Sequence, residues 1–269
     1  MIQITETQLI RFGITFIVST GWIFGTLVIS NRIGNRIGGI IGGLPSTALL
    51  SFFSIGFIQN SHEVVSAALT FPLGYANSIL FLLVIYRLWH KKSFNISLLM
   101  ALGLWISLAW LIRELSVWSF LINVICMIFI SLIGFYGLRG SGRYLSTTPN
   151  LIRRGWRLFL RSACGGFFIT LVCLVSMFLG SKSGGILAAF PIMFLSLILI
   201  SNKSYGREHT LGMIPRLMLS GTINIGVFVL VIYYLTPLLG YVLGIGIAFC
   251  ISLVTMTVLL AKKSYLPKR

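Results

Sequence analysis

Long stretches of apolar residues, separated by short polar segments, recur from one end of this chain to the other. Each stretch is close to the roughly 20 residues that an α-helix needs to cross a bilayer. The pattern predicts an all-α, polytopic membrane protein with nine transmembrane helices. The predicted spans are residues 12–30, 37–59, 64–86, 94–112, 115–138, 158–180, 183–201, 210–235 and 237–261.

The boundary between the fourth and fifth spans is marked only by Arg113 and Glu114. The basic residues favour keeping these spans separate. With nine spans and the N-terminus outside, 17 of the 21 Lys and Arg residues fall in cytoplasmic segments. Merging the two spans would divide the basic residues between the two sides. The positive-inside rule therefore predicts nine spans in a cytoplasmic (inner) membrane, with the N-terminus outside and the C-terminus in the cytoplasm.

Composition agrees with a membrane protein, because 57% of the residues are hydrophobic and only 9% are charged. A soluble domain carries about 25% charged residues. The net charge of +17 does not indicate a nucleic-acid partner, since the basic residues are dispersed through short loops. Membrane lipids are the expected surroundings. The four cysteines lie in apolar runs without a C-x-x-C spacing, so we expect small buried side chains and no metal site or disulfide framework.

Two matched sets of residues indicate an internal repeat. The first set is Gly38, Gly39, Pro45, Gly74 and Asn77, and the second is Gly184, Gly185, Pro191, Gly221 and Asn224. The offset is 146 residues up to the prolines and 147 residues after them. These matches predict two four-helix repeats, 8–113 and 155–262, joined by a connecting helix and a basic cytoplasmic loop at 114–154. Because the connecting helix crosses the membrane once, the second repeat is inverted relative to the first, as in many secondary transporters.

The second repeat contains S-K-S-G-G-I-L-A-A-F-P at 181–191 and R-E-H-T-L-G-M at 207–213. With its flanking apolar spans, this pattern resembles the GlpM-like family of small bacterial membrane proteins, which have about four helices and a Gly-rich segment leading to a proline. The resemblance covers roughly 160–260 well and 12–113 loosely. It implies a fused pair of such units, and it implies an architecture without assigning an activity.

The Gly-Gly…Pro segments are the first candidates for a binding site. A proline within a helix removes one hydrogen bond and clashes with the carbonyl of the residue four positions earlier. In hydrocarbon the freed carbonyls need partners in protein, water or ligand, and transporters bind substrates at such broken helices. We therefore expect interruptions near Gly38–Pro45 and Gly184–Pro191. The alternative is that the glycines allow close packing and the prolines only bend the helices.

Other polar residues add to this candidate site. Asn77 and Asn224 lie in the middle of spans, where an amide either binds a solute or bonds to a neighbouring helix. Arg216 either extends its side chain to the membrane surface or attracts an anionic group. Glu63 and Glu208 are expected near helix N-termini, where the helix dipole favours acids.

These patterns exclude most enzymes, because no intramembrane carboxylate is available as a general acid, general base or metal ligand. We expect no catalytic residue, no cofactor and no metal. The leading hypothesis is a secondary transporter or permease for a small polar or anionic solute, which binds between inverted repeats. The alternatives are a non-transporting assembly partner of an envelope pathway, and a lipid flippase or scramblase.

Overall fold

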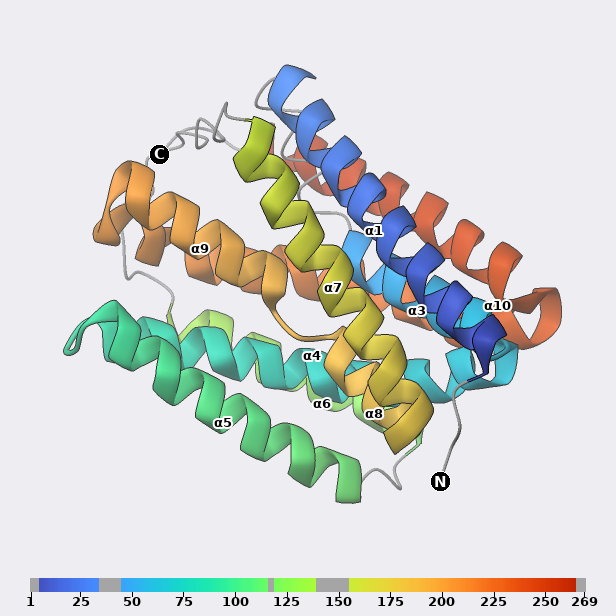
Figure 1. The fold of residues 1–269 in the computed structure, drawn as a ribbon. Coiled ribbons are helices and arrows are strands. Elements are labelled where there is room, and N and C mark those ends of the chain that lie inside the picture. The colour runs from blue at the N-terminus through green and yellow to red at the C-terminus, as the bar shows by residue number, and fades with distance from the viewer. Residues whose placement is uncertain (1–4, 34–44, 116–118, 139–154, 265–269) are drawn as a thin grey trace.

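The computed structural model describes residues 5–33, 45–115, 119–138 and 155–264, and these residues form helices with no strand among them (Figure 1). The helices are α1 (Glu6–Ile33), α3 (Ser46–Ile58), α4 (Ser61–Trp89), α5 (Phe94–Leu115), α6 (Phe120–Gly137), α7 (Gly155–Leu179), α8 (Ser181–Ala188), α9 (Ile192–Tyr205) and α10 (Arg207–Ser264). The all-α prediction is confirmed for this part of the chain.

Six described segments are long and apolar enough to cross a membrane. They are Glu6–Val28, Ser61–Trp89, Phe94–Glu114, Phe120–Gly137, Leu158–Leu179 and Gly221–Val258. The last contains 38 residues, well beyond the length of one crossing, and Gly240 within it is non-helical, with a φ of 78°. The chain is therefore a helical membrane protein with six segments of spanning length in its described part.

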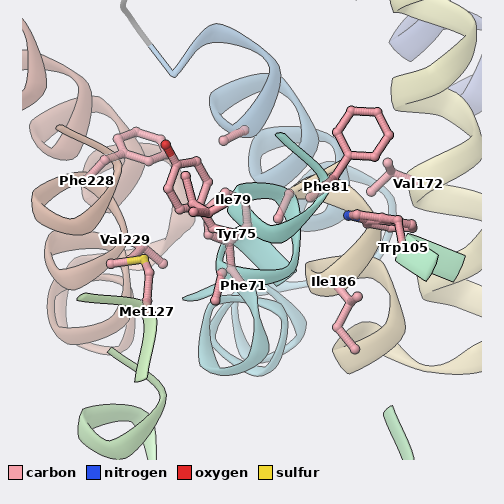
Figure 2. Close-up of a cluster of buried hydrophobic side chains, with 14 of the residues drawn as sticks. Phe71, Tyr75, Ile79, Phe81, Trp105, Met127, Val172, Ile186, Phe228 and Val229 are labelled. Carbon is pink, nitrogen blue, oxygen red and sulfur yellow. The ribbon is translucent and has the colours of Figure 1, made fainter. Parts of the chain in front are cut away.

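Helix α4 lies at the centre of the bundle, in contact with α3, α5, α6, α8 and α10 (Figure 1). One of its faces carries Phe71, Tyr75 and Ile79, which are almost completely buried. Figure 2 shows this face near Met127 of α6 and Phe228 of α10. Burial on most sides makes α4 the element against which both halves of the chain pack.

The outer helices present apolar side chains to the surroundings. Leu9 of α1, Leu99 of α5, Phe129 of α6 and Leu238 of α10 are all largely exposed. In water such a surface would drive aggregation, whereas in a bilayer it faces lipid tails. The expectation that the cysteines are buried is wrong for two of them, because Cys164 and Cys250 are also exposed. Lipid-facing and interior positions are both apolar, so hydropathy alone does not separate them.

The two ends of the bundle differ in charge. The α4–α5 turn and the α9–α10 junction lie at one end, at the left of Figure 1, whereas α1 begins and α5 ends at the other. Charged residues near the first end are Arg87, Lys91, Lys92, Lys203, Arg207 and one acid, Glu208. Charged residues near the second end are Glu6, Arg11, Glu63, Arg113, Glu114 and Lys182. We call these the basic end and the mixed-charge end.

Candidate solute-binding site

The chain leaves helical geometry between α8 and α9. Helix α8 ends at Ala188, and α9 begins at Ile192 after Pro191, whose φ and ψ are −79° and 44°. Proline has no N–H to continue the helix. The N–H of Ala189 instead donates to the carbonyl of Ile186, 3.2 Å away, which tightens the last turn of α8. The interruption predicted near Gly184–Pro191 is confirmed.

The glycine pair before this break lies inside regular helix and allows α8 to approach its neighbours. A Cβ atom at Gly185 would collide with the backbone carbonyl oxygen of Ala67 and lie 2.7 Å from Oγ1 of Thr70. On the facing side, a Cβ at Gly74 would lie 2.8 Å from the carbonyl oxygen of Ile186. Here the glycines permit close contact between α4 and α8, and the opening of the backbone occurs later, at residues 189–191.

The matching segment of the first half is described only in part, because Gly38 and Gly39 lie outside the described residues. Pro45 precedes α3 with φ and ψ of −75° and 49°, close to the values at Pro191. Its carbonyl accepts from Leu49 N at 2.8 Å, and that of Pro191 accepts from Leu195 N at the same distance. The two prolines therefore start α3 and α9 in the same way.

A row of polar residues follows the face of α4 that meets α8. Glu63, Ser66, Thr70 and Ser78 are spaced three, four and eight residues apart, which places them on one side of a helix. The hydroxyl of Thr70 donates to the carbonyl of Lys182 at 2.7 Å. We call these four residues the polar row.

The polar row ends at the helix break. The hydroxyl of Ser78 donates to the carbonyl oxygen of Ala189 at 2.6 Å, and it accepts from Nε1 of Trp105 at 3.2 Å. Ser78 is completely buried. A backbone carbonyl that the break removes from the helix is thus bonded to a side chain of the opposite half, as a low-dielectric interior requires.

At the mixed-charge end the polar row opens into a cavity of about 380 Å³. Its lining residues are Glu63, Ser66, Arg113, Glu114, Leu179, Gly180, Ser181, Lys182 and Ser183. They come from the start of α4, the end of α5 and the α7–α8 junction, so both halves of the chain contribute. The hydroxyl of Ser181 donates to Oε2 of Glu63 across this boundary. We call this cavity the entrance pocket.

The two predicted asparagines are buried and bind different helices. Nδ2 of Asn77 donates to the carbonyl of Trp105 in α5 at 2.9 Å, and Oδ1 of Asn224 accepts from the hydroxyl of Ser252 in α10 at 2.8 Å. Each partner lies 28 residues after its asparagine. Asn77 is linked to the helix break through Trp105 and Ser78, whereas neither asparagine lines the entrance pocket.

The second half of the chain is similar to one known protein family. Residues 158–264 match a family of proteins of unknown function, DUF3147. The match begins in α7 and ends with α10, and it covers less than half of the chain. It does not link the chain to the GlpM-like family, so that resemblance stays an expectation from the sequence. No curated protein and no solved structure matches the chain.

The remaining candidates are placed as follows. Arg216 belongs to α10, but its side chain lies outside the described part of the structure. Glu63 and Glu208 lie in the first turns of α4 and α10, as predicted, and Oδ1 of Asn60 caps α4 by accepting from Glu63 N at 3.1 Å. Among the described residues, no group of three His, Cys, Asp or Glu side chains could hold a metal ion.

Sequence reasoning missed Ser66, Thr70, Ser78, Trp105 and Ser181. For Ser66, Thr70 and Ser78 the signal was the helical spacing of small polar residues, which could have been recognised in span three. The partner helix of that face could not have been recognised, because the contact between α4 and α8 joins residues more than 100 positions apart.

Proposed function

We propose that this protein is a secondary transporter or permease that moves a small polar solute between its two halves. The observation that carries the proposal is the polar row, which runs along α4 from the entrance pocket to the level of the broken helix α8–α9. Polar groups inside a membrane are expensive and tend to mark solute or ion pathways. A broken helix offers backbone carbonyls to a bound solute or ion, and transporters place their sites at such breaks.

The arrangement of helices supports two repeats, at 8–113 and 155–262, around a connecting segment, 114–154. Helix α7 corresponds to α1, α9 to α3, and the parts of α10 before and after Gly240 to α4 and α5, at offsets of 146 and 147 residues. Helix α6 then connects the two repeats. The DUF3147 match covers the second repeat alone, which is consistent with a separate unit. We infer nine crossings, with the second repeat inverted, and a cytoplasmic-membrane location.

The charge difference between the two ends of the bundle predicts the orientation. Because basic segments remain in the cytoplasm, the basic end should face inward and the mixed-charge end outward. Reporter fusions at the two termini are expected to place the N-terminus outside and the C-terminus inside. A finding that both termini lie in the cytoplasm would rule out nine crossings and the inverted repeat together.

Transport is tested with a nearly isosteric substitution, Thr70→Val, at the middle of the polar row. Solutes that raise the melting temperature of the purified protein are first identified, since a ligand of the native state stabilises it. Their uptake into proteoliposomes is then measured. We expect Thr70→Val to reduce uptake by about tenfold, because a lost hydrogen bond between uncharged groups weakens a site by roughly 1 kcal/mol or more.

The matched control is Thr257→Val. Thr257 is exposed on α10, and its hydroxyl donates to the carbonyl of Leu253 in the same helix, at 2.8 Å. This variant should transport like the unchanged protein. If stabilising solutes are not taken up, or if both variants behave alike, the transporter proposal fails.

The second candidate is a non-transporting membrane partner or assembly factor. Its support is the packing at the centre of the bundle. Asn77 bonds to α5, Asn224 bonds to the part of α10 after Gly240, and Gly185 brings α8 against α4. Such features also belong to helix interfaces without a solute path. The two candidates differ in whether water reaches the polar row.

A further inference from the structure

The entrance pocket has an unusual charge composition for a chain with a net charge of +17. Its four charged side chains are two acids, Glu63 and Glu114, and two bases, Arg113 and Lys182. The whole chain has only four acidic residues, so half of them line this one cavity. The pocket is therefore nearly neutral while containing both signs of charge.

We propose that the entrance pocket binds a small zwitterion, a molecule with one ammonium group and one acidic group. The inference rests on the proposed function, for which it names the class of solute. A simple anion would meet two carboxylates in this cavity, and a simple cation would meet two basic groups. A zwitterion can place each of its charges beside the opposite sign, and this complementarity supplies specificity.

The acidic side of the pocket is held in place by contacts between the two halves. Glu63 lies in the first turn of α4, and its carboxylate accepts from the hydroxyl of Ser181 at the start of α8. Ser181 in turn accepts from Ser176 at 3.2 Å, and Ser176 accepts from Nε2 of Gln59 at 2.8 Å. This chain of hydrogen bonds fixes the carboxylate at the pocket wall, where it can receive an ammonium group.

The basic side is strengthened by the start of α8. The residue before the helix is Gly180, which has no side chain to cap it, and the helix dipole places partial positive charge at this end. Lys182 and Ser183, in the first turn of α8, line the pocket, as does Arg113 from α5. An acidic group bound here is favoured by two cationic side chains and by the helix N-terminus together.

Size and position agree with a small ligand at the membrane surface. A volume of about 380 Å³ is at the lower end of the range for ligand sites, roughly 300–1,000 Å³. The pocket lies where α4 and α8 begin and α5 and α7 end, close to the level of lipid headgroups. The same chemistry could therefore come from a soluble amino acid or from the headgroup of an ethanolamine phospholipid.

The test compares matched probes for the full-length protein in a maltoside detergent, which carries no charge. One set contains L-serine, its anionic derivative N-acetyl-L-serine and its cationic derivative L-serinamide. The second contains glycerophosphoethanolamine, glycerol 3-phosphate and ethanolamine. We expect a zwitterion to raise the melting temperature in a concentration-dependent way. Its counterparts that carry only one sign of charge should bind at least about tenfold more weakly.

The two sets separate the sources of the ligand. Stabilisation by L-serine points to a soluble amino acid, and stabilisation by glycerophosphoethanolamine alone points to a lipid headgroup. If neither zwitterion stabilises the protein, or if the probes with only one sign of charge do so equally well, the proposal is overturned.

Paired substitutions test whether zwitterions bind in the entrance pocket. Lys182→Gln and Glu114→Gln should each weaken zwitterion binding by at least about threefold, as expected for the loss of an exposed charge pair. The controls are Lys203→Gln and Glu208→Gln, which remove the same charges from exposed positions near the basic end and should leave binding unchanged. Equal effects of all four variants would also overturn the proposal.

This inference and the proposed function can fail separately. If zwitterions bind but are not taken up, the proposed binding site is supported and the transporter proposal is contradicted. If the protein takes up an uncharged solute and no zwitterion stabilises it, the transporter proposal is supported and the zwitterion proposal is contradicted.

Discussion

Gly185→Ala is expected to lower the free energy of unfolding by about 2 kcal/mol, within the range for overpacking a close contact. A Cβ at this position would collide with the carbonyl of Ala67 and lie 2.7 Å from Oγ1 of Thr70. The carbonyl belongs to helix backbone and cannot move without displacing α4 from α8. Unfolding of the purified protein in detergent, followed by heat or denaturant, measures the change.

Gly103→Ala is the matched control. Gly103 also lies within a helix, α5, but an added Cβ would meet nothing within 4 Å. Here alanine should be neutral or stabilising by roughly 0.5–1 kcal/mol, because glycine is the poorer helix former. Equal stability of the two variants would contradict the close contact between α4 and α8.

Ser78→Ala should lower stability by about 1–2 kcal/mol, near the upper limit for a hydrogen bond inside a membrane protein. The substitution removes the donor to the carbonyl of Ala189 and the acceptor of Nε1 of Trp105. Both groups are buried, so the loss leaves one carbonyl and one indole N–H without these partners. The same unfolding measurement detects the effect.

Its control is Ser107→Ala in α5, where the exposed hydroxyl donates to Gly103 of the same helix at 2.9 Å. Removing it should change stability by less than about 0.5 kcal/mol. A Ser78→Ala variant as stable as this control would show that the break between α8 and α9 does not depend on the polar row.

The features that sequence predicted correctly are local ones. The helical character follows from the length of the apolar runs, and the break before Ile192 follows from the chemistry of Pro191. The positions of Glu63 and Glu208 in first helical turns follow from the helix dipole. Each depends on residues within a few positions of one another.

The features that sequence did not predict depend on which helix faces meet. Thr70 and Ser78 are small polar residues in an apolar span, and only the approach of α8 gives them the carbonyls of Lys182 and Ala189 as partners. The entrance pocket likewise requires the ends of α5 and α7 to lie beside the start of α4. Hydropathy is nearly the same on the lipid-facing and buried sides, so it contains little information about these contacts.

The central claim, a solute path along the polar row, is tested most directly by the access of water to position 78. Ser78→Cys is placed in a background from which the four native cysteines have been removed, with Ile79→Cys as the control at the same depth. Ile79 is fully buried among apolar side chains on another face of α4. A membrane-impermeant thiol reagent is then added to either side of sealed vesicles. A transporter predicts that the thiol of the Ser78→Cys variant reacts from both sides, while the thiol of the Ile79→Cys variant reacts from neither. A thiol at position 78 that reacts from one side only, or no faster than the thiol at position 79, would contradict the account and identify the row as a dry packing interface.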